Sequence, residues 1–196
     1  MRSKDWLQRQ KNDFFVKKAK KEGYLSRAAF KLIEIEKKFK LISKSENILE
    51  LGSSPGGWSQ VICEFNKSSL IHAFDLLDMK YNNKQVRFFK EDVLKYNFDN
   101  IENKFDLILS DIAPNTIGHQ STDHLKLVSL IEEILLIVEK KMNLNGSFVF
   151  KIWEGSETKN IINNLKCSFN KIINFKPNSS RNRSNEKYIV AQGYNI

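Results

Sequence analysis

The sequence predicts one α/β domain with a mostly parallel, seven-stranded sheet and helices on both of its faces. After residue 46, apolar runs of strand length alternate with segments of helical periodicity, which is the pattern of a parallel sheet. One apolar run, residues 47–51, leads into a Gly-rich turn that opens directly into a helix, as in nucleotide-binding sheets. The length of 196 residues, 41% of them hydrophobic, suits one domain with a complete core.

The first expected helix spans residues 26–39. Ser26 is a favoured N-cap residue, and the apolar residues after it recur at helical spacing. Those expected to face inward are Ala29, Leu32, Ile33, Ile35 and Phe39. This segment therefore predicts a helix that packs on the sheet.

The expected strands are apolar runs bounded by polar or Gly-containing segments. They lie at residues 47–52, 70–75, 86–90, 105–111, 146–152, 171–176 and 187–193. Further helices are expected at 57–66, 123–141 and 157–168. The apolar stripe expected in the longest of them consists of Leu125, Val128, Ile131, Leu135 and Val138. A short polar loop joins the last two strands, which favours an antiparallel pairing of these two strands at the sheet edge.

The positive charge is concentrated at the start of the chain. Residues 1–44 contain 14 Lys and Arg residues against 5 Asp and Glu residues, so this segment carries the whole formal net charge of +9. Its aromatic residues include Trp6, Phe14, Phe15, Tyr24 and Phe30. A basic arm with aromatic residues favours a polyanionic partner, most simply a nucleic acid. The alternative is a solvated helix face whose lysines only aid solubility.

Cysteine usage and hydropathy exclude several classes of protein. Cys63 and Cys167 are not spaced for metal binding or redox chemistry, so we expect reduced thiols and no metal site. No apolar run approaches the ~20 residues of a membrane span, and the start of the chain does not resemble a secretory signal. We therefore expect an intracellular protein without a membrane partner, in the cytoplasm, the nucleolus or an organelle.

The Gly-rich turn indicates the class of ligand. Its sequence is Gly52-Ser-Ser-Pro-Gly-Gly57, and Ser54 stands where a dinucleotide-binding motif has its middle glycine. A triphosphate-binding loop is also excluded, because no Gly-Lys-[Ser/Thr] follows. Asp75 ends the next apolar run, where a carboxylate can accept hydrogen bonds from ribose hydroxyls. A nucleoside without a pyrophosphate fits best, and S-adenosylmethionine is the common one; the alternative is a generic α/β turn.

Three polar residues are expected at the carboxyl ends of the strands, where ligands bind in such sheets. Asp111 ends one strand, Asp92 follows another, and Lys151 interrupts a strand that is otherwise fit for burial. A lysine is seldom buried without a partner, so Lys151 favours a functional role. The alternative for Asp111 is a structural cap. Taken alone, Lys31 and Glu186 would be interpreted as surface residues.

Five segments together resemble the FtsJ/RrmJ family of S-adenosylmethionine-dependent RNA ribose 2′-O-methyltransferases. They are Ser26-Arg-Ala-Ala-Phe-Lys-Leu32, Leu51-Gly-Ser-Ser-Pro-Gly-Gly-Trp-Ser-Gln60, Asp75-Leu-Leu-Asp-Met79, Ser110-Asp-Ile-Ala-Pro-Asn115 and Lys176-Pro-Asn-Ser-Ser-Arg181. The resemblance covers nearly the whole chain in the right order. It implies a Rossmann-like class I methyltransferase fold, a monomer and a catalytic tetrad. The tetrad falls on Lys31, Asp111, Lys151 and Glu186.

The resemblance also implies the binding residues. Those implied for S-adenosylmethionine, which leaves as S-adenosylhomocysteine, are Gly52, Pro55, Gly57, Trp58, Asp75, Asp92 and Asp111. Those expected to bind RNA are Arg27, Lys31, Arg181 and Arg183. On this interpretation, residues 1–44 form a basic, RNA-facing arm and helix, and residues 45–196 form the cofactor-binding domain. The sequence departs from the family at Glu50, usually an aspartate, and at Ser53-Ser54, usually small apolar residues. We expect these departures to alter packing or cofactor affinity.

The chemistry of the tetrad agrees with ribose methylation. A ribose hydroxyl is a poor nucleophile that needs a proton acceptor, precise placement, or both. A lysine can act as the base when a desolvated or cationic environment lowers its pKa. We therefore expect Lys151 to act as the base or to orient the hydroxyl, with Asp111 holding it. Lys31 and Glu186 would orient the target ribose, and positioning should dominate the catalysis.

The segment from Lys176 to Ala191, and Trp6-Leu-Gln near the start, resemble the bacterial-type branch that acts on large-subunit ribosomal RNA. The expected target is a uridine of that RNA. The alternatives within the family are the tRNA anticodon loop and the mRNA cap. From other classes, a noncatalytic RNA-binding relative, an NAD-dependent oxidoreductase and a small-molecule methyltransferase are weighed. The tetrad argues against the noncatalytic relative, and Ser54 and the basic arm argue against the oxidoreductase. The basic arm also argues against the small-molecule methyltransferase.

Overall fold

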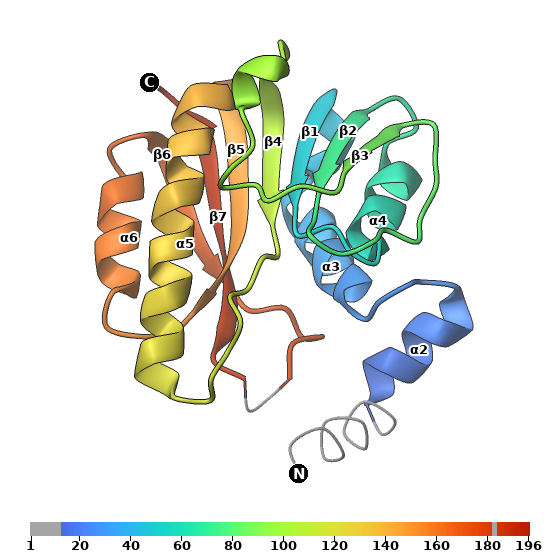
Figure 1. The fold of residues 1–196 in the computed structure, drawn as a ribbon, viewed down its shortest axis with the longest axis horizontal. Coiled ribbons are helices and arrows are strands. Elements are labelled where there is room, and N and C mark those ends of the chain that lie inside the picture. The colour runs from blue at the N-terminus through green and yellow to red at the C-terminus, as the bar shows by residue number, and fades with distance from the viewer. Residues whose placement is uncertain (1–12, 182–183) are drawn as a thin grey trace.

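The computed structural model describes residues 13–181 and 184–196, which form one sheet with helices on both sides (Figure 1). The strands are β1 (Asn47–Leu51), β2 (Leu70–Phe74), β3 (Val86–Phe89), β4 (Phe105–Ser110), β5 (Met142–Trp153), β6 (Phe169–Phe175) and β7 (Glu186–Tyr194). The α-helices are α2 (Phe14–Glu22), α3 (Ala28–Phe39), α4 (Gly57–Phe65), α5 (Gln120–Lys141) and α6 (Thr158–Leu165), with short 3₁₀ turns η1 (Ile42–Lys44) and η2 (Phe98–Asn100).

The described strands form a seven-stranded sheet in the order β3-β2-β1-β4-β5-β7-β6. β1 to β5 are parallel, whereas β7 runs antiparallel between β5 and β6. The sequence prediction of a mostly parallel sheet with an antiparallel last strand is therefore confirmed. The strand order reverses between β1 and β4. Ligands bind at such a reversal in open α/β sheets.

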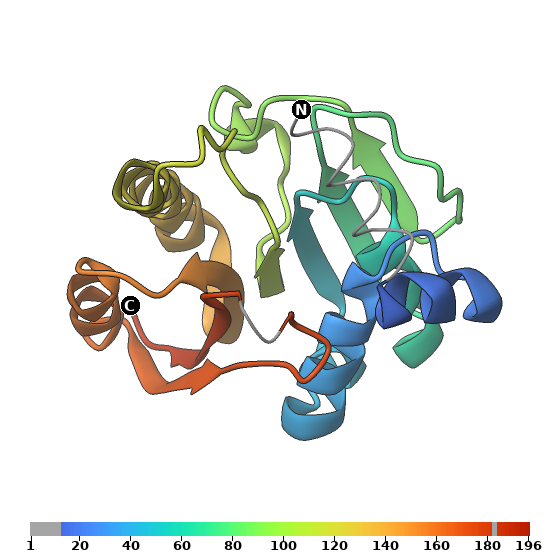
Figure 2. The same cartoon turned by 90° about the horizontal axis from the view of Figure 1, so that it is seen from below.

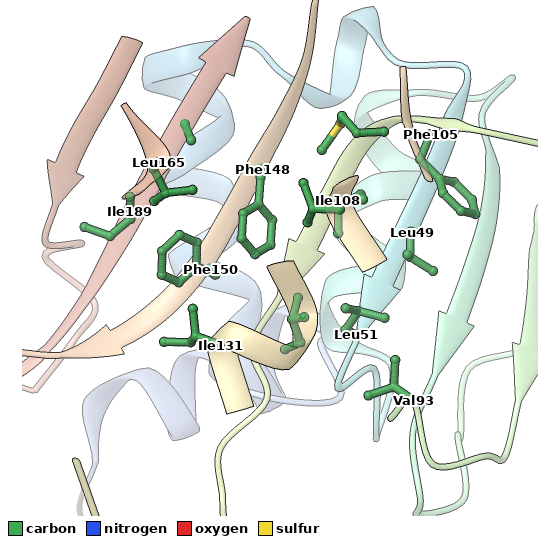
Figure 3. Close-up of a cluster of buried hydrophobic side chains, with 14 of the residues drawn as sticks. Leu49, Leu51, Val93, Phe105, Ile108, Ile131, Phe148, Phe150, Leu165 and Ile189 are labelled. Carbon is green, nitrogen blue, oxygen red and sulfur yellow. The ribbon is translucent and has the colours of Figure 1, made fainter. Parts of the chain in front are cut away.

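Two hydrophobic cores lie on opposite faces of the sheet. Helices α5 and α6 cover one face, where Ile131 and Leu165 pack against Ile108, Phe148 and Phe150 (Figure 3). Helices α3 and α4 cover the other face and bury the side chains of Leu32, Ile35, Val61, Ile62, Val149 and Val190. Side chains of a strand alternate between the faces, so the apolar run of β5 supplies both cores.

Two local expectations for the helices are wrong. Helix α3 begins at Ala28, after Arg27, and Ser26 does not cap it; Ser26 instead packs against Gly57, where a Cβ would collide with its hydroxyl. Leu125 is 54% exposed, because the buried stripe of α5 runs along Leu127, Ile131, Ile134 and Val138. The neighbouring residues Asp123 and His124 are buried, so Leu125 is exposed because it lies on the outer side of the helix.

Helix α2 lies within the basic arm, where the sequence alone predicts no separate helix. The Asp13 carboxylate caps it by accepting hydrogen bonds from the backbone N–H groups of Phe15 and Val16, and Gly23 ends it with a φ of 81°. Residues 1–12, with Trp6, and residues 182–183, with Arg183, lie outside the described residues. None of the described helices has the length and apolar character to span a membrane.

Candidate active site

Four predicted residues come together at the carboxyl ends of the parallel strands. Asp111 follows β4, and Lys151 lies near the end of β5. In the antiparallel ladder, Lys151 is opposite Tyr188, and Trp153 is opposite Glu186. Opposed residues share a face of the sheet, so Lys151, Tyr188 and Glu186 point toward α3, which supplies Lys31. Figure 2 views the molecule from the side of these strand ends.

The four charged side chains form two ion pairs. Lys31 Nζ lies 2.6 Å from Glu186 Oε1, and Lys151 Nζ lies 3.1 Å from Asp111 Oδ1. Lys151 Nζ also donates a hydrogen bond to the backbone carbonyl of Asp111. Lys31 is 9% exposed and Lys151 is 8% exposed. Both ammonium groups are therefore buried and held in fixed positions by carboxylates, as buried charges require.

The surrounding charges keep Asp111 ionised. Burial alone would raise the pKa of its carboxyl group, but the positive charges of Lys151 and Lys31 and a hydrogen bond from Tyr188 outweigh it. The pKa of Asp111 consequently lies below its ordinary value. Asp111 thus remains a stable anionic partner for Lys151 near neutral pH.

Tyr188 is a site residue that the sequence interpretation missed. Its hydroxyl donates to Asp111 Oδ1 at 2.7 Å, and Lys31 Nζ lies 5.7 Å from the centre of its ring. Burial and the charges of Asp111 and Glu186 raise the pKa of Tyr188 well above its ordinary value, so the hydroxyl keeps its proton. The available signal was its spacing: Tyr188 stands two residues after Glu186, on the same face of the last strand.

A cavity of about 860 Å³ lies directly beside this cluster, and Asp111 belongs to both. Its lining includes backbone and side chains from the Gly-rich turn and from the segments after β2, β3 and β4. The charged residues in the lining are Asp75, Glu91, Asp92, Asp111, Glu133 and Lys126. Five carboxylates against one lysine disfavour a pyrophosphate and favour a ligand with cationic groups and hydroxyls.

The segment 176–185, of which residues 182 and 183 lie outside the described part of the chain, is anchored beside the cluster through residues 178–181. Its partners are Glu34 of α3 and the residues just before α2 and α3, Asp13 and Arg27. Glu34 accepts hydrogen bonds from the backbone N–H groups of Asn178 and Ser179, at 2.6 and 2.8 Å. Arg27 donates to the carbonyl oxygen of Ser179 and pairs with Asp13. Asp13 also lies 3.1 Å from Arg181 Nε. Sequence interpretation missed both Asp13 and Glu34, whose partners are distant in the chain.

Comparison with known proteins decides the family. The model of the FtsJ-like methyltransferase family matches residues 24–194. The chain belongs to the FtsJ-like methyltransferase family. It is 39% identical to the ribosomal RNA large subunit methyltransferase E of Rickettsia bellii, over 96% of this chain and 88% of that protein. It is 40% identical to the protein of the same name from Zymomonas mobilis, over 96% and 87%.

Solved structures agree with the fold of the methyltransferase. A crystal structure of a Plasmodium falciparum protein described as a ribosomal RNA methyltransferase superposes with a TM-score of 0.76 at 32% identity. The alignment covers 87% of this chain and 98% of the other. A fibrillarin complex, at 18% identity and a TM-score of 0.57, shares the fold alone. The expectation of a Rossmann-like RNA methyltransferase is confirmed.

The cavity of the methyltransferase suits S-adenosylmethionine. This cofactor carries a sulfonium and an ammonium group, which the surplus of carboxylates favours, and two ribose hydroxyls. Asp75 is held at the mouth of the turn, because its carboxylate accepts from the N–H groups of Ser54 and Leu77, each at 2.8 Å. In Asp92, Oδ1 accepts a hydrogen bond from the backbone N–H of Leu94 at 3.1 Å, and Oδ2 lies 3.6 Å from Lys95 Nζ. Oδ2 can therefore still accept a hydrogen bond from a ligand.

The predicted cofactor residues divide into two groups. Gly52, Asp75, Asp92 and Asp111 line the cavity, whereas Pro55, Gly57 and Trp58 do not. Trp58 is 3% exposed and donates from Nε1 to the carbonyl of Ala28 at 2.8 Å, so it joins α4 to α3. These three residues shape the turn, and direct cofactor contacts from them stay a prediction. In the described part of the chain, no group of three metal-ligating side chains is present.

Proposed function

We propose that the methyltransferase transfers a methyl group from S-adenosylmethionine to a ribose 2′-hydroxyl of RNA, and that the target is a uridine of large-subunit ribosomal RNA. The observation that carries this proposal is the junction at Asp111, where the two buried ion pairs meet the acidic cavity. A methyl donor in the cavity and a hydroxyl at Lys151 would face each other across this junction. Bound S-adenosylmethionine supplies an electrophilic methyl group.

The residues of the chain supply placement for this reaction. Lys151 Nζ, held by both the carboxylate and the carbonyl of Asp111, has a fixed direction from which its ammonium group can donate to the hydroxyl and orient it. To act as the base, the amine must first release a proton to solvent, and it can then take the proton of the hydroxyl. The Lys31–Glu186 pair presents a second donor and acceptor on the same face. Ser180 Oγ donates to Glu186 Oε1 at 3.1 Å, so the 176–185 segment joins this network. Fixing both reactants in this way removes much of the entropic barrier to methyl transfer.

RNA is proposed to cross α2 and the 176–185 segment. Lys17, Lys20 and Lys21 are exposed on α2, and Arg181 is exposed beside Asp13. By contrast, Lys44 lines a cavity with Asp106 and Gly146, at the amino ends of β4 and β5 and away from the catalytic cluster. The basic residues of 13–44 therefore fall into two groups, and only one lies beside the site.

Arg181→Ala is expected to weaken RNA binding several-fold and to reduce the slope of log affinity against log salt by about one, because one phosphate contact is lost. Fluorescence anisotropy with ribosomal RNA fragments, at salt concentrations from about 50 to about 300 mM, measures both the affinity and the slope. The matched control is Lys44→Ala, which should leave both affinity and slope unchanged. Equal effects of the two substitutions would contradict the proposed RNA path.

The relatives named above point to large-subunit ribosomal RNA. The test is the transfer of labelled methyl from S-adenosylmethionine to large ribosomal subunits, naked ribosomal RNA and tRNA in parallel. We expect label in the subunit or its RNA. Label in tRNA alone would contradict the ribosomal target while keeping the chemistry. An absence of label in all three, with cofactor binding demonstrated, would favour a noncatalytic relative.

A further inference from the structure

A second cavity, of about 560 Å³, lies at the ends of β5 and β7 and borders α5 next to the acidic cavity. We call it the Trp153 cavity. It is bounded by the segment before α5, the first turn of α5, the end of β5 and the residues just before β7, and its lining includes Gln120, His124, Leu125, Trp153, Gly155 and Asn185. No residue assigned to catalysis or to the cofactor lines it.

The Trp153 cavity shares two strand ends with the catalytic cluster. Trp153 follows Lys151 by two residues in β5, which is about 7 Å of strand. It stands opposite Glu186 in the β5–β7 ladder, and Asn185 immediately precedes Glu186. A ribose held by Lys151 and Glu186 therefore has the Trp153 cavity within reach of its base.

The walls of the Trp153 cavity are fixed by hydrogen bonds. Asp123 accepts from the backbone N–H groups of Ile117 and Gly118, at 2.8 and 2.9 Å, and so holds the segment before α5. Glu154 N donates to the carbonyl of Asn185 at 3.0 Å, which joins the ends of β5 and β7. Gly155 lies so close to His124 that a Cβ there would be 2.5 Å from the ring nitrogen Nε2. These contacts describe a preformed site.

The side chains of this cavity fit an uncharged aromatic ring. Trp153 is half-buried, and Leu125 is an apolar side chain left 54% exposed. Among the described lining residues there is no Lys or Arg, so the cavity offers no charge for a phosphate. The Glu154 carboxylate is already paired with Lys187 at 2.7 Å. Single-stranded RNA is commonly read by stacking a base on an aromatic side chain and hydrogen-bonding its edge.

His124 adds a donor without a partner. It is 6% exposed, and its Nε2 accepts a hydrogen bond from the backbone N–H of Glu157 at 3.3 Å. The neutral ring then carries its proton on Nδ1, which is buried and has no partner among the described residues. An unpaired buried donor is costly, and rotation of the ring toward the cavity that it lines would let Nδ1 donate to a base carbonyl.

We propose that the Trp153 cavity receives the base of the nucleotide whose ribose is methylated, with Trp153 as the stacking surface. This inference rests on the proposed function, because it concerns the same RNA substrate. The target base is thereby turned out of its stack, while the phosphates stay on α2 and the 176–185 segment. The cavity also gives the enzyme a means to select a nucleotide, since the ribose itself carries no base information.

The test compares two RNAs, with the methylated ribose first located by digestion of the wild-type product. One RNA is intact, and the other lacks only the base at that ribose. We expect Trp153→Ala to lower kcat/KM on intact RNA about 10- to 100-fold, as expected for one lost stacking contact, and Trp153→Phe to restore most of it. The abasic RNA should be a poor substrate for the wild type, and Trp153→Ala should lower its rate no further.

A purely structural role for Trp153 would give a different result. It would lower the rates on both RNAs by the same factor, and that outcome would overturn the inference, as would a Trp153→Ala rate on intact RNA within two-fold of wild type. Leu125→Ser provides a second variant that should fold normally, because the side chain is exposed; it should also discriminate less between the two RNAs. Its matched control is Leu136→Ser, an equally exposed leucine of α5 outside the cavity.

The two proposals fail in distinguishable ways. A wild-type enzyme that methylates no RNA overturns the proposed function, and the base-binding role with it. A wild-type enzyme that methylates RNA but treats intact and abasic substrates alike overturns only the role of the Trp153 cavity. Cofactor affinity, measured by calorimetry, should be unchanged in every variant, because none of the substituted residues lines the acidic cavity.

Discussion

Replacing Lys151 with alanine is expected to lower kcat by at least about 1,000-fold, near the upper range for a lost acid–base group. The ammonium group is buried and fixed by two oxygens of Asp111, and a water molecule filling the space left by its removal would have neither its charge nor its fixed position. Cofactor affinity should stay within a few-fold of wild type, because Lys151 does not line the acidic cavity. Single-turnover methylation and calorimetric titration with S-adenosylmethionine measure the two quantities separately.

Lys141→Ala is the matched control for burial. Lys141 is 7% exposed, and its ammonium group donates to the carbonyl of Ile101, at the far end of α5 from the catalytic cluster. This variant should lose stability and keep its kcat. Near-normal turnover by Lys151→Ala, or an equal loss of turnover in both variants, would contradict the role assigned to Lys151.

Glu50→Gln is expected to stabilise the protein near neutral pH. Glu50 is fully buried; its Oε2 accepts from Ser59, and its Oε1 has no partner among the described residues. Burial, reinforced by the charges of Asp111 and Asp75, raises the pKa of Glu50 to about 8. Folding at neutral pH therefore requires uptake of a proton, which costs on the order of 3 kcal/mol at pH 7.

The size of the stabilisation expected from Glu50→Gln depends on pH. Below the ordinary pKa of a glutamate, the carboxyl is protonated in both folded and unfolded chains, and the penalty vanishes. Between that value and about 8, only the folded chain holds the proton, so wild-type stability falls as pH rises. The gain from Glu50→Gln should thus grow from pH 5 to pH 8, reaching about 1 to 3 kcal/mol after the cost of burying an amide is deducted.

Urea unfolding at about pH 5, 6, 7 and 8 measures this gain in the free energy of unfolding. Glu36→Gln is the control, because Glu36 is equally buried but accepts backbone hydrogen bonds from Ile42 and Ser43, at 2.7 and 3.1 Å. Substitution there removes an acceptor and should destabilise the protein at pH 7. A stability difference between Glu50→Gln and wild type that does not change with pH would show that Glu50 is ionised in the folded state.

Much of the fold could be predicted from the sequence because it rests on local patterns. The runs that became β1, β2 and β4 are mostly apolar, as expected for strands buried on both faces. Asp111 and Lys151 were placed correctly because the ends of parallel strands meet at one edge. Lys31 and Glu186 carry no such local signal, and only the resemblance to a family singled them out.

The remaining features depend on contacts that a single sequence does not contain. Gly57 is implied by the resemblance as a cofactor-binding residue, and the structure adds a packing role, because a Cβ there would collide with Ser26. Asp13 looked like one acid in a basic arm, yet it joins Arg27 to Arg181, which lies 168 residues away. Leu125 matched a helical period but lies on the outer side of α5, between the buried residues His124 and Leu127. In each case, tertiary packing determined the role of the residue.

The central claim is that the cluster at Asp111 directs a methyl group to a ribose oxygen. Its most direct test is nucleoside analysis of RNA methylated with labelled S-adenosylmethionine by the wild-type enzyme and by Lys151→Ala. We expect the wild type to place all label in a 2′-O-methylated nucleoside and Lys151→Ala to place none. Label on a base, or the same labelled nucleoside from both enzymes, would contradict it.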